Sequence, residues 1–353
     1  MRFGTFSYNQ WRPDVPEAQG FAELLEQIEL TERLGFDEAW FAEHHHSDYG
    51  LLSSPNLMIA HLAPRTSRLR MGNLVNALPL HDPMRLAEEC AILDILTGGR
   101  LNVGLGRGVQ RDDIKHGLDR DAAQARFDEG IDILQRAWTE ETFSHHGTAW
   151  NYQDISCRPR PIQRPHPPIY YGSISADSVL DVARRGWNLA LSRQPLDNVV
   201  RAVESFRAAR AALGNPPGGG NVLVVREIYV ADSDEQAWAE AGIQITRFWQ
   251  MAGDNRWSHD PITTDDLPRY TSRFPYFRGG MTLEQVDEWG VSLIGSPETV
   301  ARKARAMVEA ARPDSLVGLF SFGGLTHAQI THSLELFATR VMPALAAEPV
   351  ASR

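Results

Sequence analysis

The chain has 353 residues, 42% hydrophobic and 23% charged, which is typical of a globular protein with a large core. A formal net charge of -10 argues against a nucleic-acid partner, because phosphate binding needs a basic face. The sequence has no apolar run of the ~18 residues that span a membrane and no signal-peptide pattern at its start, so we expect a cytoplasmic protein. Cys90 and Cys157 form no C-x-x-C pair, so neither a disulfide framework nor a zinc cluster is expected.

Apolar runs typical of buried strands alternate with segments of helical period along most of the chain. The predicted strands are Arg2–Ser7, Glu38–Ala42, Arg68–Leu74, Arg100–Gly106, Pro168–Gly172, Leu189–Ser192, Val222–Ala231 and Ser315–Phe320. The predicted helices are Glu17–Leu34, Pro83–Leu96, Asp121–Trp138, Ala176–Arg185, Leu196–Leu213, Ser233–Trp249 and Ser296–Ala311. This order predicts an α/β fold, a single (β/α)8 TIM barrel over residues 1–353. A doubly wound open sheet is the alternative, although no G-x-G-x-x-G follows the first strand.

Two segments interrupt the alternation. Residues 139–167 are rich in proline, histidine and aromatic residues, and we expect a β-like excursion there before the fifth strand. Residues 250–290 have no clean period but carry many aromatic residues and arginines. A long irregular insertion in a compact domain is usually a functional lid or a disordered segment, and the aromatic content favours a lid.

Three consecutive histidines, His44, His45 and His46, follow the second predicted strand. In a barrel the carboxyl ends of the strands carry the functional residues. Imidazoles suit acid–base chemistry there because they titrate near physiological pH, and Glu43 could hold one ring in a chosen tautomer. The same triplet could instead form a hydrated surface loop or a chance metal site.

Other strand ends supply further candidates. Asn73 and Asn76 follow the third strand, Arg107 lies between two glycines after the fourth, and Ser192-Arg193-Gln194 follows the sixth. The fifth strand leads through Gly172-Ser173-Ile174-Ser175-Ala176-Asp177-Ser178 into a helix, which offers an anion site for one phosphate. Simple N-capping by Ser175 or Asp177 explains that segment equally well, and the glycines beside Arg107 could serve only a tight turn.

Several segments together resemble the bacterial luciferase-like family of flavin-dependent monooxygenases, in the family's order from about Arg2 to Leu345. They are R-F-G-T-F, G-F-D-E-A-W-F-A-E-H-H with G-L-L-S-S-P, N-A-L-P-L-H-D-P-M-R-L-A-E-E, L-D-I-L-T-G-G-R-L-N-V-G-L-G-R-G, S-I-S-A-D-S, G-S-P-E-T-V and L-E-L-F-A-T-R-V-M-P. The resemblance is loosest over residues 110–165 and 235–290. It implies a barrel that binds reduced FMN, supplied by a separate NAD(P)H:flavin reductase, and reacts it with O2 to a flavin C4a-(hydro)peroxide.

The resemblance also implies roles for individual residues. His44 matches the catalytic histidine, and a non-proline cis peptide is expected at Leu74–Val75, beneath the flavin ring. The residues expected at the cofactor are Leu74, Val75, Gly106, Arg107, Arg126, Ser173, Ile174, Ser175, Ala176 and Ser178, with Ser175, Ser178 and Arg126 at the FMN phosphate. The expected substrate pocket contains Tyr8, Trp11, His45, Asn76 and Trp249, with Trp257 and Phe274 as further candidates. A dimer is expected through Pro83–Leu96 or Ser54–Leu62.

Three departures from the luciferase pattern predict a non-luminous relative. Gly106 replaces the reactive cysteine, Ile174 replaces the glutamate of the phosphate loop, and His46 replaces the aromatic or aliphatic residue that follows E-H-H. The leading hypothesis is a two-component monooxygenase that uses FMNH2 and O2 on a small carbonyl-containing or hydrophobic substrate. An F420-dependent hydride-transfer enzyme and a non-catalytic flavin-binding subunit are the alternatives. A metal hydrolase is less consistent, because adjacent histidines do not readily converge on one ion.

Overall fold

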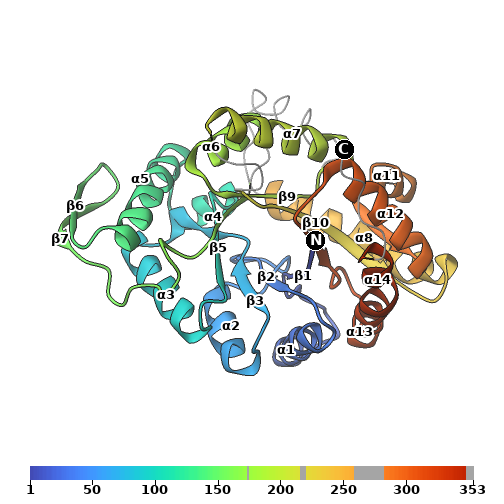
Figure 1. The fold of residues 1–353 in the computed structure, drawn as a ribbon. Coiled ribbons are helices and arrows are strands. Elements are labelled where there is room, and N and C mark those ends of the chain that lie inside the picture. The colour runs from blue at the N-terminus through green and yellow to red at the C-terminus, as the bar shows by residue number, and fades with distance from the viewer. Residues whose placement is uncertain (173–174, 215–219, 258–281, 347–353) are drawn as a thin grey trace.

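The computed structural model describes residues 1–172, 175–214, 220–257 and 282–346, and these form the predicted barrel (Figure 1). Each of eight parallel strands pairs with the next, and β12 pairs with β1 to close the ring. In ring order they are β1 (Arg2–Ser7), β2 (Glu38–Phe41), β3 (Arg70–Asn73), β5 (Leu101–Gly106), β8 (Ile169–Gly172), β9 (Asn188–Ser192), β10 (Val222–Val230) and β12 (Ser315–Leu319). All eight correspond to predicted strands, and the open-sheet alternative is wrong because the ring is closed.

Helices surround the barrel on its outer side (Figure 1). They are α1 (Glu17–Arg33), α2 (Pro55–Leu62), α3 (Pro83–Leu96), α4 (Gln110–Lys115), α5 (Arg120–Thr139), α6 (Ala176–Arg185), α7 (Leu196–Ala212), α8 (Asp234–Trp257), α11 (Leu283–Glu288), α12 (Pro297–Ala311), α13 (His327–Leu336) and α14 (Met342–Ala346). All seven predicted helices are present. Side-chain caps fix several of their starts, as where Asp82 accepts the Arg85 N–H at 2.9 Å.

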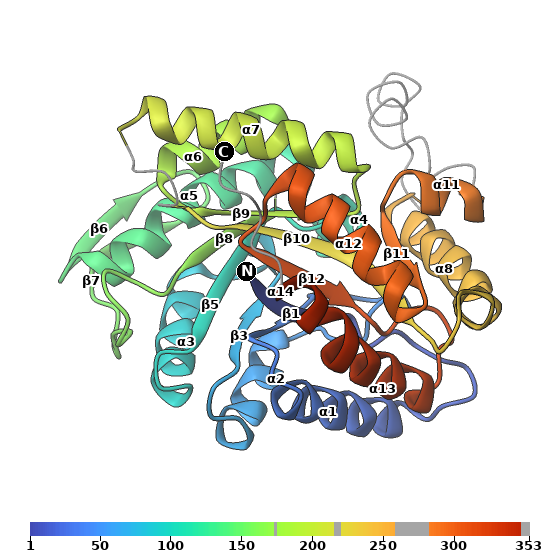
Figure 2. The ribbon, with the colours of Figure 1, turned by 45° about the vertical axis from the view of Figure 1, so that its right-hand side comes forward.

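Short strands lie outside the ring. β4 (Asn76–Ala77) pairs with β5, and β11 (Ser292–Gly295) pairs with the second half of β10. The predicted excursion over 139–167 contains an antiparallel hairpin of β6 (Phe143–His146) and β7 (Asn151–Ile155), which projects beside α5 (Figure 2). Glu129 of α5 fixes its turn by accepting the backbone N–H groups of residues 148–150 at 2.7–3.2 Å.

A buried carboxylate organises the amino-terminal end of the barrel. Glu38 on β2 is fully buried and accepts the indole N–H of Trp40 at 2.8 Å and the Ser315 hydroxyl at 3.1 Å. Arg2 Nε lies 3.1 Å from Glu38 Oε1, the oxygen that also accepts the Ser315 hydroxyl. Because these donors come from β1, β2 and β12, the carboxylate joins the first and last strands where the ring closes, which satisfies the buried charge.

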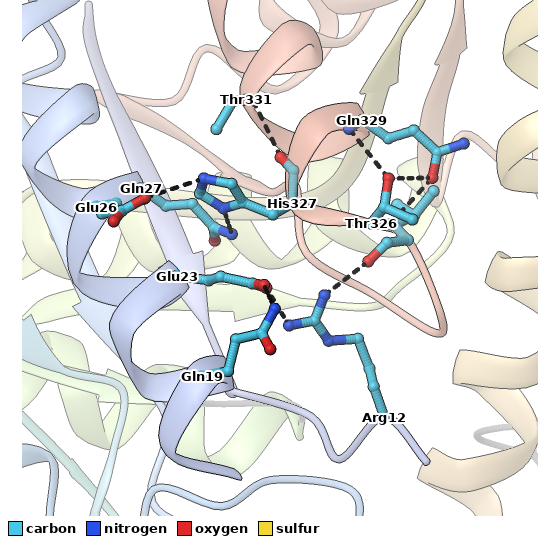
Figure 3. A network of polar contacts seen from close by, with 10 residues as sticks. Arg12, Gln19, Glu23, Glu26, Gln27, Thr326, His327, Gln329 and Thr331 are labelled. Carbon is cyan, nitrogen blue, oxygen red and sulfur yellow. Dashed lines mark hydrogen bonds and ion pairs between the residues drawn. The ribbon is translucent and has the colours of Figure 1, made fainter. Parts of the chain in front are cut away.

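A polar network joins α1 and α13 (Figure 3). Arg12, in the loop after β1, pairs with Glu23 of α1 and donates to the Leu325 carbonyl at 3.3 Å. On α13, His327 lies 3.1 Å from the Gln27 amide and 3.2 Å from the Glu26 carboxylate. These contacts fix the loops after β1 and β12, which lie at the carboxyl ends of the strands.

Candidate active site

His44 lies at the carboxyl end of β2, where the sequence predicts the catalytic residue. The Tyr8 ring stacks on its imidazole, with centroids 5.4 Å apart and planes at 15°. The Tyr49 ring meets the imidazole edge-on at 4.8 Å and 72°. Gly50 closes a third side, because a Cβ there would lie only 3.2 Å from His44 Cδ2. The loop over residues 44–52 is closed by a backbone bond from His44 to Leu52 at 3.0 Å, so it brings these residues together.

Arg193, at the end of β9, lies next to the same two tyrosines and donates to both hydroxyl groups. Burial raises the pKa of Tyr49 well above its ordinary value, and the charge of Arg193 opposes that shift. On β10, burial also raises the pKa of Glu227, and the charge of Arg193 opposes this shift as well. The Glu227 carboxylate accepts the Ser292 hydroxyl at 3.2 Å. The sequence analysis placed Arg193 at a strand end without a role and missed Tyr49 and Glu227. No local signal marks these contacts, because they join distant strands.

Glu43 is buried between two histidines. Its carboxylate accepts from His45 Nε2 at 3.0 Å, from His81 Nε2 at 2.9 Å and from the Ala77 N–H at 3.1 Å. Burial alone would raise the pKa of Glu43, but the hydrogen bonds and charges of the two histidines lower it to about 2. The pKa of His81 is raised because its bond to Glu43 outweighs burial. The prediction that Glu43 holds one ring is therefore consistent with the geometry, and His81 is a second partner that the sequence analysis missed.

The other two histidines of the triplet approach α4. The rings of His45 and His46 each lie 5.3 Å from the His116 ring, and Arg111 donates to both of their backbone carbonyls. Burial raises the pKa of Asp112, and the charges of Arg111, His45 and His116 oppose this shift. Among the residues that the structure describes, no group of three or more histidine, cysteine or acidic side chains has the arrangement of a metal site.

The peptide bond between Leu74 and Val75 is cis, as the resemblance implies. Two glycines of β5 make room for this segment at the carboxyl end of the barrel. A Cβ at Gly104 would lie 1.8 Å from the Asn73 carbonyl oxygen, and one at Gly106 would lie 2.4 Å from Val75 Cγ2. The position that carries the luciferases' cysteine is therefore filled here by the Val75 side chain. Asn76, a predicted pocket residue, is fully buried and donates to the Gly104 carbonyl at 3.0 Å.

Two arginines of the predicted cofactor site lie against α5. Arg107, after β5, donates to Gln124 at 3.1 Å. Arg126 stacks on the Trp150 ring of the hairpin, with Cζ 4.6 Å from the centroid. Its Nε is buried and has no hydrogen-bond partner among the described residues. An unpartnered buried guanidinium nitrogen and a second arginine supply what an anionic group needs.

The predicted phosphate serines form the start of α6. Ser175 accepts the Ser178 N–H at 3.2 Å, the two hydroxyls are 2.7 Å apart, and they form a reciprocal capping box. Ser175 therefore caps α6, and the same helix N-terminus, beside Ala176, is compatible with a bound anion. An ion pair of 3.5 Å from Arg185 to Asp132 links α6 to α5, the helix of Arg126. These residues fit a phosphate. The predictions for Ser173 and Ile174 fall outside the described residues.

The remaining predicted pocket residues lie on the first loop and on α8. Trp11 is half-buried, and its backbone N–H donates to the backbone carbonyl of Asp48 at 2.9 Å. Trp249 is buried and packs against Phe248, which in turn lies 5.9 Å from Tyr8 and 5.7 Å from Tyr49. Phe248 is thus a neighbour of the site that the sequence analysis missed. Most of the predicted lid, including Phe274, and the Trp257 side chain are outside the described residues.

The fold is a (β/α)8 barrel with a candidate active site at the carboxyl ends of its strands. The sequence profile described as "Luciferase-like monooxygenase" matches residues 1–313, so the chain belongs to that family. It is 28% identical over 259 residues to the oxygenase component of the flavin-dependent trigonelline monooxygenase of Acinetobacter baylyi, covering 72% of this chain and 71% of that protein. It is 25% identical over 359 residues to limonene 1,2-monooxygenase of Rhodococcus erythropolis, covering 97% and 86%.

Solved structures agree with this assignment. Monooxygenase RslO1 of Streptomyces bottropensis matches with a TM-score of 0.84 and 25% identity, covering 97% of this chain and 99% of that one. An F420-dependent secondary alcohol dehydrogenase matches with a TM-score of 0.76 and 15% identity over 98% of both chains, which shows the shared fold alone. No helix in the described part of the chain is long and apolar enough to cross a membrane.

Proposed function

We propose that the chain is the oxygenase component of a two-component monooxygenase, which uses FMNH2 and O2 to oxygenate a small carbonyl-containing or hydrophobic substrate. The enclosure of His44 by Tyr8, Tyr49 and Gly50 at the barrel's carboxyl end is the observation that carries the proposal. The name of the Acinetobacter relative, an oxygenase component, supports a separate reductase as the partner. Non-luminous chemistry is supported by Val75 filling the cysteine position.

The residues divide the task between holding the cofactor and moving a proton. Ser175, Ser178 and Arg126 would hold the FMN phosphate, and Arg107 and the Leu74–Val75 segment would lie against the flavin. When bound, reduced FMN supplies the electrons that activate O2. His44 would give or take the proton at the reacting oxygen, because an imidazole titrates near neutral pH. Its aromatic neighbours Tyr8 and Tyr49, with Phe248 packed behind them, would keep water away from it.

The test compares His44→Ala with the wild type, using a flavin reductase, NADH, FMN and a panel of ketones and aldehydes. We expect the variant to release most of its consumed O2 as H2O2 and to form roughly 10²–10⁴-fold less product, while FMNH2 still binds. His332→Ala, a half-exposed histidine of α13, is the matched control and should behave as wild type. Equal product yield in His44→Ala would remove His44 from the mechanism.

The cofactor is tested separately by anaerobic titration with FMNH2 and with reduced F420. The arginines and capped serines support FMN, whose terminal phosphate suits one compact anion site. Tighter binding of reduced F420 would contradict the proposal and favour hydride transfer. Oxygenation by the purified chain with a reductase would exclude a non-catalytic subunit.

We also propose a dimer through α2 and α3. Apolar side chains on these neighbouring helices are exposed: Leu57 at 72%, Leu96 at 55%, and Ile92 and Ile95 at 44%. Four such residues on adjacent helices suit an interface more than a solvated surface.

A further inference from the structure

Arg193 makes a forked contact at the centre of the site. One terminal nitrogen donates to the Tyr49 hydroxyl and the other to the Tyr8 hydroxyl. Its Cζ lies 5.5 Å, 5.7 Å and 5.8 Å from the rings of Tyr8, Tyr49 and Phe248. The backbone of Arg193 has a φ of 54°, in the left-handed region that non-glycine residues seldom adopt. Such a conformation persists only where the surroundings determine it, and it often marks a functional position.

The two tyrosines that Arg193 joins are the two aromatic neighbours of His44. Tyr8 covers a face of the imidazole and Tyr49 meets its edge. Both tyrosines are almost fully buried, at 2% and 3% exposure, and their ring centroids lie 4.8 Å apart. The orientation of each ring therefore depends on the position of its hydroxyl group. The guanidinium is the group that fixes both hydroxyls at once.

We propose that Arg193 is a positioning residue: by holding the Tyr8 and Tyr49 hydroxyls in one fork, it fixes both rings against His44 and so sets the direction in which the imidazole exchanges a proton. The ring contacts and the hydrogen bonds of Arg193 support the positioning of the two tyrosines. Only the proton transfer by His44 rests on the proposed function. The chain of contacts runs from β9 through β1 and the loop after β2, so it acts across the mouth of the barrel.

An arginine is the residue that this geometry requires. A planar guanidinium presents two donors in a rigid fork, whereas a lysine ammonium is a point charge that cannot hold two hydroxyls at fixed separation. Burial alone would lower the pKa of Arg193, but Tyr49, Tyr8 and Glu227 raise it above its ordinary value, so the fork keeps its charge. Arg193→Lys should therefore behave like a loss of the fork, although it conserves the charge.

The experiment follows the His44 imidazole by NMR in the protein without cofactor, so that it needs no turnover. In Arg193→Met and Arg193→Lys we expect the ring signals of His44 to shift or broaden, because the stacked Tyr8 ring is released. In a Tyr8→Phe/Tyr49→Phe background, adding Arg193→Met should cause little further change, since the fork has already lost its acceptors. Arg100→Met, which removes a guanidinium bonded to five groups near the amino-terminal end of the barrel, is the control for a general loss of packing.

Turnover gives the second measurement. In Arg193→Met we expect kcat for oxygenation to fall roughly 10²-fold, as for misplaced reacting groups, with the Kd for FMNH2 unchanged. Unchanged His44 signals in folded Arg193→Met would overturn the proposal. If that variant does not fold, Tyr8→Phe/Tyr49→Phe takes its place, and unchanged His44 signals there overturn it as well. Displaced His44 signals together with full product yield in His44→Ala would uphold the positioning role and refute the proposed function.

Discussion

Replacing Glu43 by glutamine tests whether the carboxylate between His45 and His81 stabilises the fold. The carboxylate accepts three hydrogen bonds of 2.9–3.1 Å, and its pKa falls from the ordinary 4.5 to about 2. A shift of this size corresponds to about 3 kcal/mol of free energy of unfolding at neutral pH. An amide conserves the shape but offers one acceptor, and its N–H2 group faces donors. We therefore expect Glu43→Gln to lose about 3 kcal/mol at pH 7.

The sign of the pH dependence follows from the direction of each shift. Because the folded-state pKa of Glu43 is lowered, its contribution is complete above about pH 4.5 and is lost as the pH falls toward about 2. The pKa of His81 is raised, so its contribution is complete below its ordinary value of 6.5 and is lost as the pH rises through the raised value. Both contributions are complete between about pH 4.5 and 6.5.

Urea unfolding of wild type and Glu43→Gln at pH 7, 5, 4 and 3 measures both effects. The wild type should lose stability below pH 5, and the variant should lose much less. Glu140→Gln, whose carboxylate pairs with Arg136 on the surface, is the control and should not change stability measurably. Equal unfolding free energies for wild type and Glu43→Gln at pH 7, or parallel losses in acid, would refute the reasoning.

Three further predictions concern other parts of the molecule. Gly106→Ala should lower the free energy of unfolding by about 1–3 kcal/mol in thermal or urea unfolding, because the added Cβ would meet Val75. Adding Val75→Ala should restore the lost stability, and an absence of rescue would contradict this explanation. Leu57→Glu with Leu96→Glu should convert a dimer into monomers in sedimentation velocity, and a monomeric wild type would show the interface prediction to be wrong. Ser175→Ala should cost about 1 kcal/mol as a lost cap and weaken FMN binding but not riboflavin binding; equal weakening would rule out a phosphate role.

The barrel was predictable because its strands are buried on both sides. Apolar runs such as the one within Ser315–Leu319 are visible without any tertiary information. β11 was missed because four residues after an irregular insertion carry no period. α13 was missed although Thr326 and Gln329 form a capping box, a signal that the sequence does contain.

The site was predictable only in part. Strand-end position and family resemblance led to His44, Tyr8 and the cis peptide at Leu74–Val75, since His44 lies within a short quoted motif and the others lie within two residues of one. The contact of Arg193 with Tyr49 joins residues 144 positions apart, and it exists only because the ring closes. His81 reaches Glu43 across 38 positions, because the strands that precede them, β2 and β3, are paired neighbours. Sequence pattern can place residues at the same end of a barrel, but it cannot pair their side chains.

Unusual backbone conformations support the location of the site independently of the family. Five non-glycine residues in the described part of the chain have a positive φ. Asp154 lies in the hairpin and Arg312 ends α12, where a left-handed residue is common. The other three, Asn9, His46 and Arg193, follow β1, β2 and β9, and all lie at the carboxyl end of the barrel. Conformations that cost of order 1–3 kcal/mol are retained where packing determines them and function benefits. Their concentration around His44 is therefore a second, physical reason to place the reaction there.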